Sequence, residues 1–183
     1  EPGDEVICPA TAPIFVSLPV FAAGAIPVFA DVDPRTLIVS PEGIEARLSA
    51  RTRAIVVQHT FGLVADVAGA IRAAQPSGIP VIEDCAHALG AALRGQPVGS
   101  LATAAFFSTD HTKVAGAGTG GMVTTSDAAL AERLAAIQAR TPFLSAARVR
   151  TMLAAFASEV LLADPRVYRV GPLVKRVLWR LGL

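Results

Sequence analysis

Short apolar runs alternate with segments of helical length over roughly the first 140 residues, and this alternation constrains the fold more than any other feature of the chain. Residues 52–58 form a run that is apolar on both faces, which is typical of a strand inside a parallel sheet. Strands that alternate with helices are typical of a parallel sheet covered by helices. The sequence therefore predicts an α/β fold.

The individual elements can be placed from apolar periodicity and from helix-capping residues. We expect strands at residues 5–8, 26–30, 52–58, 79–82, 104–107 and 122–125, and a small hairpin over residues 91–98. We expect helices at residues 11–23, 40–50, 65–75, 127–140 and 145–162, and one or two more within residues 167–181. Ser40 and Ser126 are the predicted N-caps of the second and fourth helices, because serine is favoured at that position.

Polar residues follow two of the apolar runs between residues 80 and 123. The first run is followed by Glu83 and Asp84, and the second by Ser108 and then by Lys113 and a glycine-rich stretch at 116–121. Ligands of open α/β sheets bind at the carboxyl ends of the strands. The sequence therefore predicts a binding site that contains these polar side chains.

Lys113 and Asp84 suit the two ends of a pyridine cofactor. Lys113 is one of two lysines in the chain, and a lysine in an apolar, glycine-rich context can supply a free amine for covalent bonding to a carbonyl. A carboxylate at a strand end can keep a pyridinium nitrogen protonated, as pyridoxal phosphate requires. From residue types alone, a surface lysine and a helix-capping aspartate are the alternative.

The order and spacing of these residues resemble the sugar aminotransferases of the DegT/DnrJ/EryC1/StrS family, which are pyridoxal-phosphate enzymes of fold type I. The resemblance extends from residue 3 to about residue 138. The motifs that carry it are Gly3-Asp4-Glu5-Val6, Pro27-Val28-Phe29-Ala30-Asp31-Val32-Asp33, Arg51-Thr52-Arg53-Ala54-Ile55, His59-Thr60-Phe61-Gly62, Glu83-Asp84-Cys85-Ala86-His87-Ala88, Val98-Gly99-Ser100-Leu101 and Gly120-Gly121-Met122-Val123-Thr124-Thr125.

The resemblance implies a domain organisation. Residues 1–140 would be a three-layer α/β/α pyridoxal-phosphate transferase large domain with a mostly parallel sheet. The segment that holds the cofactor phosphate in the family would be missing before it. Residues 141–183 would be a helical basic tail or insertion, and the small C-terminal domain of the family would also be missing. The chain would therefore be a fragment.

The resemblance also implies roles for four residues. Lys113 would bind the cofactor covalently and then move the proton between substrate and cofactor, and Asp84 would pair with the pyridine nitrogen. Ser108 would donate to the cofactor phosphate, and His87 stands where the family usually has glutamine, near the phenolic oxygen of the ring. Relatives that dehydrate sugars carry histidine in place of Lys113, so the lysine favours transamination. No metal site is predicted.

The implied function is transfer of an amino group from an amino acid, with glutamate as the expected donor, to a nucleotide-linked keto-sugar. The pathway would be cell-surface polysaccharide or secondary-metabolite biosynthesis, and the enzyme would be a cytoplasmic homodimer. Pro13 stands where the family has an aromatic residue against the cofactor ring. This departure favours the alternative, a degenerate or truncated member that acts as a regulatory or scaffolding subunit.

Charge and composition narrow the classes of function and partner that the chain can have. The net charge of +1 argues against general nucleic-acid binding, and two cysteines are too few for a disulfide framework. Residues 148–183 hold seven basic and two acidic residues, whereas residues 1–147 hold nine and thirteen. This basic tail has apolar residues at helical spacing, so it fits either contact with an anionic membrane surface or packing against a protein surface.

Overall fold

The computed structural model describes residues 1–162 and 171–180. It divides into two compact units, Glu1–Ala135 and Ala136–Leu183. The first unit holds the sheet and the helices α1, α2 and α3, together with the start of α4. The boundary that we predicted at residue 140, between a cofactor-binding large domain and a helical tail, stays a prediction.

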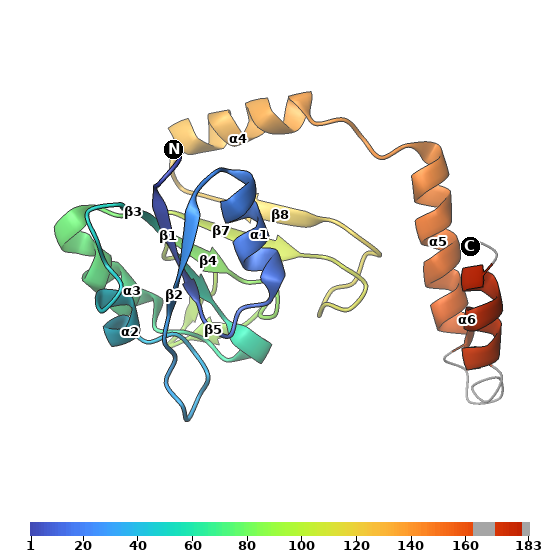
Figure 1. Cartoon of the computed structure of the whole chain (residues 1–183), viewed down its shortest axis with the longest axis horizontal. Helices are drawn as coiled ribbons and strands as arrows, with labels where there is room; N and C mark the ends of the chain where they lie inside the picture. The colour runs from blue at the N-terminus through green and yellow to red at the C-terminus, as the bar shows by residue number, and fades with distance from the viewer. Residues whose placement is uncertain (163–170, 181–183) are drawn as a thin grey trace. The chain divides into compact units, whose positions relative to one another are not determined.

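A six-stranded sheet in the order β2-β1-β3-β4-β7-β8 forms the centre of the first unit (Figure 1). The strands are β1 (Glu5–Pro9), β2 (Ile26–Ala30), β3 (Thr52–Gln58), β4 (Val81–Asp84), β7 (Ala104–Ser108) and β8 (Gly121–Thr124). Each neighbouring pair is parallel except β7 and β8, which are antiparallel. The predicted mostly parallel α/β sheet is therefore confirmed.

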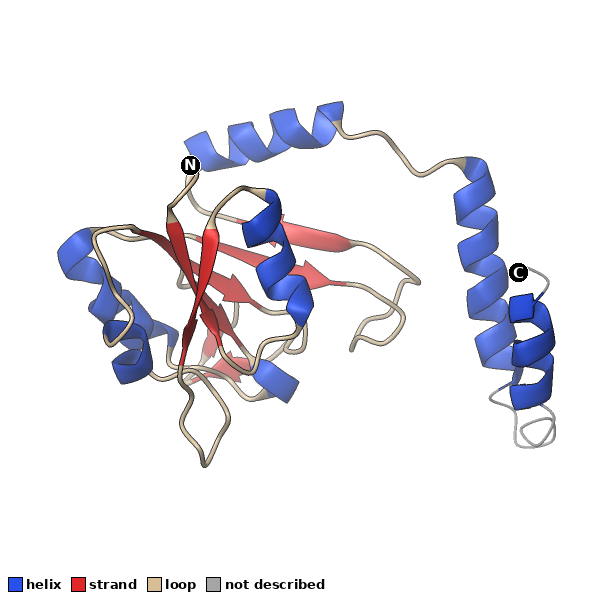
Figure 2. Ribbon diagram, viewed as in Figure 1, coloured by secondary structure: helices blue, strands red, loops and turns tan. Residues whose placement is uncertain are grey.

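Helices cover both faces of this sheet (Figures 1 and 2). Helix α1 (Ile14–Ala22) packs its Val16 and Val20 against one face, beside Cys8 and Val56. Helices α2 (Pro41–Glu45) and α3 (Val67–Ala74) cover the other face. The core on that side consists of alternate strand residues and helix residues, among them Ile7, Ile55, Val57, Val81, Ile44 and Ala70. The three-layer α/β/α arrangement follows directly from the period of two in the strands.

Side-chain caps decide where the helices begin, and they correct two predictions. Ser40 caps α2 as predicted, because its hydroxyl accepts from the Gly43 backbone N–H at 3.0 Å. Asp66 caps α3, which therefore begins at Val67 rather than at residue 65. Asp127, and not Ser126, accepts from the Leu130 N–H and begins α4 (Ala128–Arg140). A carboxylate accepts this hydrogen bond at least as well as a hydroxyl.

Several element boundaries also differ from the predictions. Helix α1, for example, begins at Ile14 and not at residue 11. Helix α2 ends at Glu45, not near residue 50, because Ser49 and Thr52 form a turn in which the Ser49 N–H donates to the Thr52 hydroxyl. Strand β4 covers Val81–Asp84 rather than residues 79–82. Glu83 and Asp84 are therefore the last two residues of the strand and do not follow it. This shift decides the geometry of the site, since consecutive strand residues point to opposite faces.

Smaller elements complete the first unit. The predicted hairpin is formed by β5 (Ala92–Leu93) and β6 (Gln96–Pro97), and its turn residues Arg94 and Gly95 both have positive φ. Two short 3-10 helices, η1 (Thr60–Gly62) and η2 (Gln75–Ser77), follow β3 and α3.

The second unit contains the end of α4 and two further helices, α5 (Ala146–Leu162) and α6 (Gly171–Arg180). Ser145 caps α5 by accepting from the Arg148 N–H at 3.2 Å. The predicted helical residues 167–170 and 181 lie outside the described residues. Among the described helices, none has the length and apolar character needed to cross a membrane.

Candidate active site

Three residues form a row across the sheet near the carboxyl ends of its strands. Gln58 of β3 is in register with Asp84 of β4, and Asp84 is in register with Phe106 of β7. Residues in register on parallel strands point to the same face. Val56 precedes Gln58 by two and packs against α1, so this row lies on the face that α1 covers. Ser108 lies two residues beyond Phe106 on the same face, about 7 Å further along the strand.

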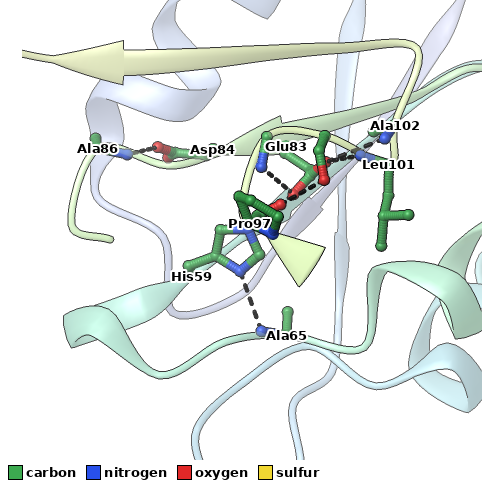
Figure 3. Close-up of polar contacts among 10 residues, drawn as sticks. His59, Ala65, Glu83, Asp84, Ala86, Pro97, Leu101 and Ala102 are labelled. Atoms are coloured by element: carbon green, nitrogen blue, oxygen red, sulfur yellow. Dashed lines mark hydrogen bonds and ion pairs between the residues drawn. The ribbon is translucent and has the colours of Figure 1, made fainter. Parts of the chain in front are cut away.

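The Asp84 carboxylate is held from two sides. The Gln58 side-chain amide donates to Oδ2 at 2.5 Å, and the Ala86 backbone N–H donates to Oδ1 at 2.9 Å. Figure 3 shows the contact with Ala86. The Thr60 hydroxyl donates to Gln58 Oε1 at 3.2 Å, which turns the NH₂ group of the amide towards Asp84. The carboxylate plane is therefore fixed by donors from two different elements.

Asp84 is buried, with 1% of its surface exposed, yet its carboxylate accepts only two hydrogen bonds from the residues that the structure describes. In the described part of the chain, no arginine, lysine or histidine forms an ion pair with it. An ionised carboxylate has about four lone-pair sites, and buried carboxylates are normally paired with cations or more fully hydrogen-bonded. The site is thus chemically suited to a cationic N–H partner, which is what a protonated pyridine ring would provide.

Glu83 points to the opposite face and anchors a different set of groups (Figure 3). Its carboxylate accepts from His59 Nε2 at 3.1 Å and from the backbone N–H groups of Gly99, Leu101 and Ala102 at 2.7, 3.2 and 3.0 Å. These four donors come from the end of β3 and from the segment before β7. Glu83 therefore joins β4 to both of its neighbouring strands at the edge where Asp84 lies.

The protonation states in this cluster follow from its hydrogen bonds. The Ala65 N–H donates to His59 Nδ1 at 3.1 Å, so Nε2 carries the proton and donates it to Glu83. Burial raises the pKa of Glu83, but the hydrogen bonds from His59 and from the three backbone N–H groups outweigh burial, and the pKa lies below its usual value. His59, buried and hydrogen-bonded at both ring nitrogens, is a structural residue of this cluster.

A metal ion does not suit these buried groups, although His59, Glu83 and Cys85 place one donor atom each within 4.8 Å of one another. The hydrogen bonds described above already occupy the His59 ring and the Glu83 oxygens. Burial, together with the charges of Glu83 and Asp84, raises the pKa of the Cys85 thiol to about 12. The cluster is therefore a hydrogen-bonded network and not a set of free ligands.

His87 lies beside an exposed aromatic residue in a strained conformation. The Phe61 ring stacks on the His87 ring with a centroid separation of 6.1 Å and an interplanar angle of 7°. Phe61 has φ 55°, which is rare for a residue other than glycine. Its backbone N–H donates to His87 Nδ1 at 3.4 Å, so the neutral imidazole carries its proton on Nε2. That N–H is a donor of the kind that the predicted role requires.

Ser108 and Lys113 lie at the end of β7 and in the loop before β8. The Ser108 hydroxyl accepts from the Asp110 N–H at 3.3 Å, and the Lys113 backbone N–H donates to the Asp110 carbonyl at 2.9 Å. Since β4 and β7 are parallel, Ser108 and the loop of Lys113 are at the same edge of the sheet as Asp84. Within the described residues, no hydrogen bond or ion pair joins the Lys113 amine to Asp84. The structure thus brings the four predicted residues to one edge of the sheet, and none of the hydrogen bonds or ion pairs among the described residues joins two of them.

A cavity of about 410 Å³ lies on the face opposite to Asp84. It is lined by the beginning of α3, by the β5–β6 hairpin and by Glu83, and it includes the exposed cation Arg72. None of the four predicted site residues lines it. This cavity is therefore separate from the candidate active site.

The sequence does not reveal the part that two residues play in the site. Gln58 ends an otherwise apolar strand, and Phe61 stands within a family motif. A polar residue at the end of an otherwise apolar run was the available signal for Gln58. The strained backbone of Phe61 leaves no mark in the sequence.

Comparison with known proteins is consistent with this geometry. The model of the DegT/DnrJ/EryC1/StrS aminotransferase family matches residues 1–149. The chain is 50% identical over 137 residues to an L-glutamine:2-deoxy-scyllo-inosose aminotransferase of Streptomyces fradiae, an alignment that covers 75% of this chain and 32% of the relative. It is 48% identical over 134 residues to a UDP-N-acetyl-3-dehydro-alpha-D-glucosamine 3-aminotransferase of Acidithiobacillus ferrooxidans, covering 73% of this chain and 36% of the relative.

Solved structures give the same relationship. A sugar aminotransferase from Streptococcus pneumoniae in its PLP form is 27% identical, with a TM-score of 0.67, and the match covers 73% of this chain and 38% of that one. The chain spans about a third of the length of the curated relatives that it matches. Residues 1–149, which the family model matches, include the sheet and the candidate site.

Proposed function

Because the chain belongs to the DegT/DnrJ/EryC1/StrS aminotransferase family, we propose that it supplies the cofactor-binding sheet of a pyridoxal-phosphate-dependent aminotransferase. The observation that supports this most is the buried Asp84 carboxylate, which has two hydrogen-bond donors and no cation among the described residues. Ser108 shares its face of the sheet and Lys113 its edge. Pyridoxal phosphate, when bound, supplies an electron sink for a carbon–hydrogen bond next to nitrogen.

The residues of the chain would divide the work at the cofactor. Asp84 would hold a proton on the ring nitrogen, and the Nε2–H of His87 would donate to the phenolic oxygen. Ser108 would donate its hydroxyl hydrogen to the phosphate group. Lys113 would attach the cofactor through its amine, and after release the same amine would carry a proton between two carbons, because one mobile base can reach both.

The amino acceptor that we propose is a keto group on a polyhydroxylated six-membered ring, and specifically a nucleotide-linked keto-sugar with glutamate as the donor. The name of the Acidithiobacillus ferrooxidans relative supports a nucleotide-linked acceptor. The name of the Streptomyces fradiae relative supports a second candidate, an inosose acceptor with glutamine as the donor. The aminated product would serve cell-surface polysaccharide or secondary-metabolite biosynthesis.

Cofactor attachment is tested on the full chain as its gene encodes it. We expect pyridoxal phosphate to give an absorbance band at about 420 nm, typical of the cofactor bound to a lysine, and the Lys113→Ala variant to lack it. Lys175→Ala, at the other lysine of this chain, is the matched control. A band that survives Lys113→Ala would reject the lysine assignment. A chain that binds no cofactor would favour the regulatory or scaffolding alternative.

The substrate is tested by pairing two donors, glutamate and glutamine, with two acceptors, a UDP-linked 3-keto-sugar and a scyllo-inosose, in the active full chain. Product is measured by mass spectrometry as the replacement of a keto oxygen by an amino group. We expect the UDP-linked acceptor with glutamate to react fastest. Faster reaction of the inosose with glutamine would transfer the assignment to the second candidate.

We also propose that the protein works as a homodimer. Helix α1 leaves the apolar side chains of Ile14, Phe15, Leu18 and Phe21 exposed, and it contains no charged residue. Exposed apolar faces of this kind mark protein interfaces. Sedimentation of the full chain should give a dimer that Phe15→Asp weakens. Phe143→Asp, at a fully exposed phenylalanine outside α1, is the control and should leave the dimer intact.

A further inference from the structure

Gln58 stands where it can control the carboxylate at the centre of the site. Its side chain is buried, with 1% exposed, and its amide donates to Asp84 Oδ2 at 2.5 Å. The register of β3 on β4 places the two residues directly opposite each other. A buried amide that has both a donor contact and an acceptor contact is held in one orientation.

The orientation of the amide is set by Thr60. The Thr60 hydroxyl, also buried, donates to Gln58 Oε1 at 3.2 Å. This contact fixes which end of the amide is the oxygen and which is the nitrogen. The NH₂ group therefore faces Asp84, and it cannot turn without placing an oxygen against a carboxylate. A chain of hydrogen bonds thus runs from Thr60 through Gln58 to Asp84.

The carboxylate is left with a defined free side. Gln58 takes one lone pair of Oδ2 and the Ala86 N–H takes one lone pair of Oδ1, so about two of its four lone-pair sites remain. A carboxylate that loses a hydrogen-bond donor binds a proton more tightly, so that it competes better for the proton of a neighbouring base. The donor on Oδ2 therefore keeps Asp84 as the acceptor in the pair that it would form with a ring nitrogen.

From these contacts we propose that Gln58, set by Thr60, is a positioning residue that orients Asp84 and keeps the cofactor ring nitrogen protonated. The inference rests on the proposed function, since it assumes that Asp84 meets the ring nitrogen of pyridoxal phosphate. It adds a specific requirement, namely a neutral hydrogen-bond donor at position 58. A hydrogen bond to a charged group corresponds to a roughly ten- to hundred-fold effect on an equilibrium.

The test uses the full chain loaded with pyridoxal phosphate that carries ¹⁵N in the ring, because the nitrogen chemical shift reports whether the ring is protonated. Wild type should show a protonated nitrogen at neutral pH. Gln58→Met, which keeps the shape and removes the donor, should shift the signal towards the unprotonated form and weaken cofactor binding about ten-fold or more. Gln75→Met, at an exposed glutamine, is the matched control.

Gln58→Glu gives a second readout, the pH dependence of the ring-nitrogen signal, which is compared at each pH with that of Gln58→Met or, where that variant unfolds, with that of wild type. Its carboxylate opposes Asp84 when ionised and donates a hydrogen bond when protonated, so the ring nitrogen signal should return towards wild type as the pH falls. The other titratable or charged groups lie on the packed strands or in the loops at their carboxyl ends: Glu5 and Cys8 on β1, Arg53 on β3, His59 after β3, Glu83 on β4, Cys85 and His87 after β4, and Asp110, His111 and Lys113 after β7. Helix α1 has none. Burial raises the pKa of Cys8 to about 11, so neither cysteine titrates in this range.

The outcomes separate the inference from the proposed function. If wild type binds the cofactor with a protonated nitrogen and both Gln58 variants give the same signal, the role of Gln58 is refuted and the function stands. If wild type does not bind the cofactor at all, both fall. If Gln58→Met unfolds, the pH response of Gln58→Glu decides, and a signal that does not move with pH overturns the inference.

Discussion

Replacing Glu83 by glutamine tests whether this carboxylate organises the edge of the sheet. The substitution preserves the size of the side chain and changes one oxygen into an NH₂ group. Oε1 of Glu83 accepts from Leu101 and Ala102, and Oε2 accepts from Gly99 and His59. The amide oxygen can serve only one of these pairs, so its NH₂ group must face two N–H donors.

The size of the effect follows from the two donors that lose their acceptor. Leaving a buried donor unsatisfied costs about 1–3 kcal/mol, so Glu83→Gln should reduce the free energy of unfolding by about 2–6 kcal/mol. His59 cannot relieve the conflict by moving its proton to Nδ1. That nitrogen already accepts from the Ala65 N–H, and a change of tautomer would break this contact as well.

Urea unfolding of the wild type and Glu83→Gln, followed by circular dichroism, measures the difference. Glu132→Gln removes an exposed carboxylate and is the control, with an expected change within about 0.5 kcal/mol. A loss below about 1 kcal/mol for Glu83→Gln, with an unchanged dependence on urea, would refute the reasoning. It would mean that the four contacts do not hold the edge of the sheet.

Three further predictions concern the same region. Burial raises the pKa of Glu83, but its hydrogen bonds outweigh burial and hold the pKa below its ordinary value, so the stability that this carboxylate contributes is present near neutral pH and is lost as the pH falls through its pKa. Urea unfolding measured from about pH 7 to about pH 3 should therefore show a larger loss of stability in wild type than in Glu83→Gln, and parallel losses would contradict this. Gly99→Ala should reduce the free energy of unfolding by about 2–4 kcal/mol in thermal unfolding, because Gly99 has φ 81° and an added Cβ would lie 2.6 Å from the Phe107 ring. Gly78, with φ 61° and open space around it, is the control, and Gly78→Ala should reduce it by about 1–2 kcal/mol. Equal losses of stability would exclude the steric conflict at Gly99. Phe61→Val should be less stable than Phe61→Gly by about 1–2 kcal/mol, since a β-branched residue tolerates φ 55° poorly, and the reverse order of melting temperatures would argue against backbone strain.

The sheet was predictable because each strand carries its own local signal. Runs of apolar residues at 26–30 and 52–58 gave the bounds of β2 and β3 as observed. Helix ends were less predictable where two capping residues are adjacent, as with Ser126 and Asp127, because both can accept the same hydrogen bond. Only coordinates show which of them does.

The candidate site was predictable in its composition but not in its connections. Asp84, Ser108 and Lys113 could be assigned to one edge because parallel strands end together. The partnership of Asp84 with Gln58 depends on the register between two strands that are separated by 22 intervening residues, 59–80, and no local pattern encodes that register. The four-donor environment of Glu83 likewise depends on a loop that is 16 to 19 residues away in the sequence.

Two pairs of consecutive polar residues, Gln58-His59 at the end of β3 and Glu83-Asp84 at the end of β4, together specify how these strands align. Because successive strand residues point to opposite faces, Gln58 meets Asp84 on one face and His59 meets Glu83 on the other. A slip of one residue would send each polar side chain to the wrong face and leave buried donors and carboxylates without partners. Apolar residues alone would tolerate such a slip better here, since β3 is apolar on both faces. The buried polar pairs therefore fix the register on which the position of Asp84 depends.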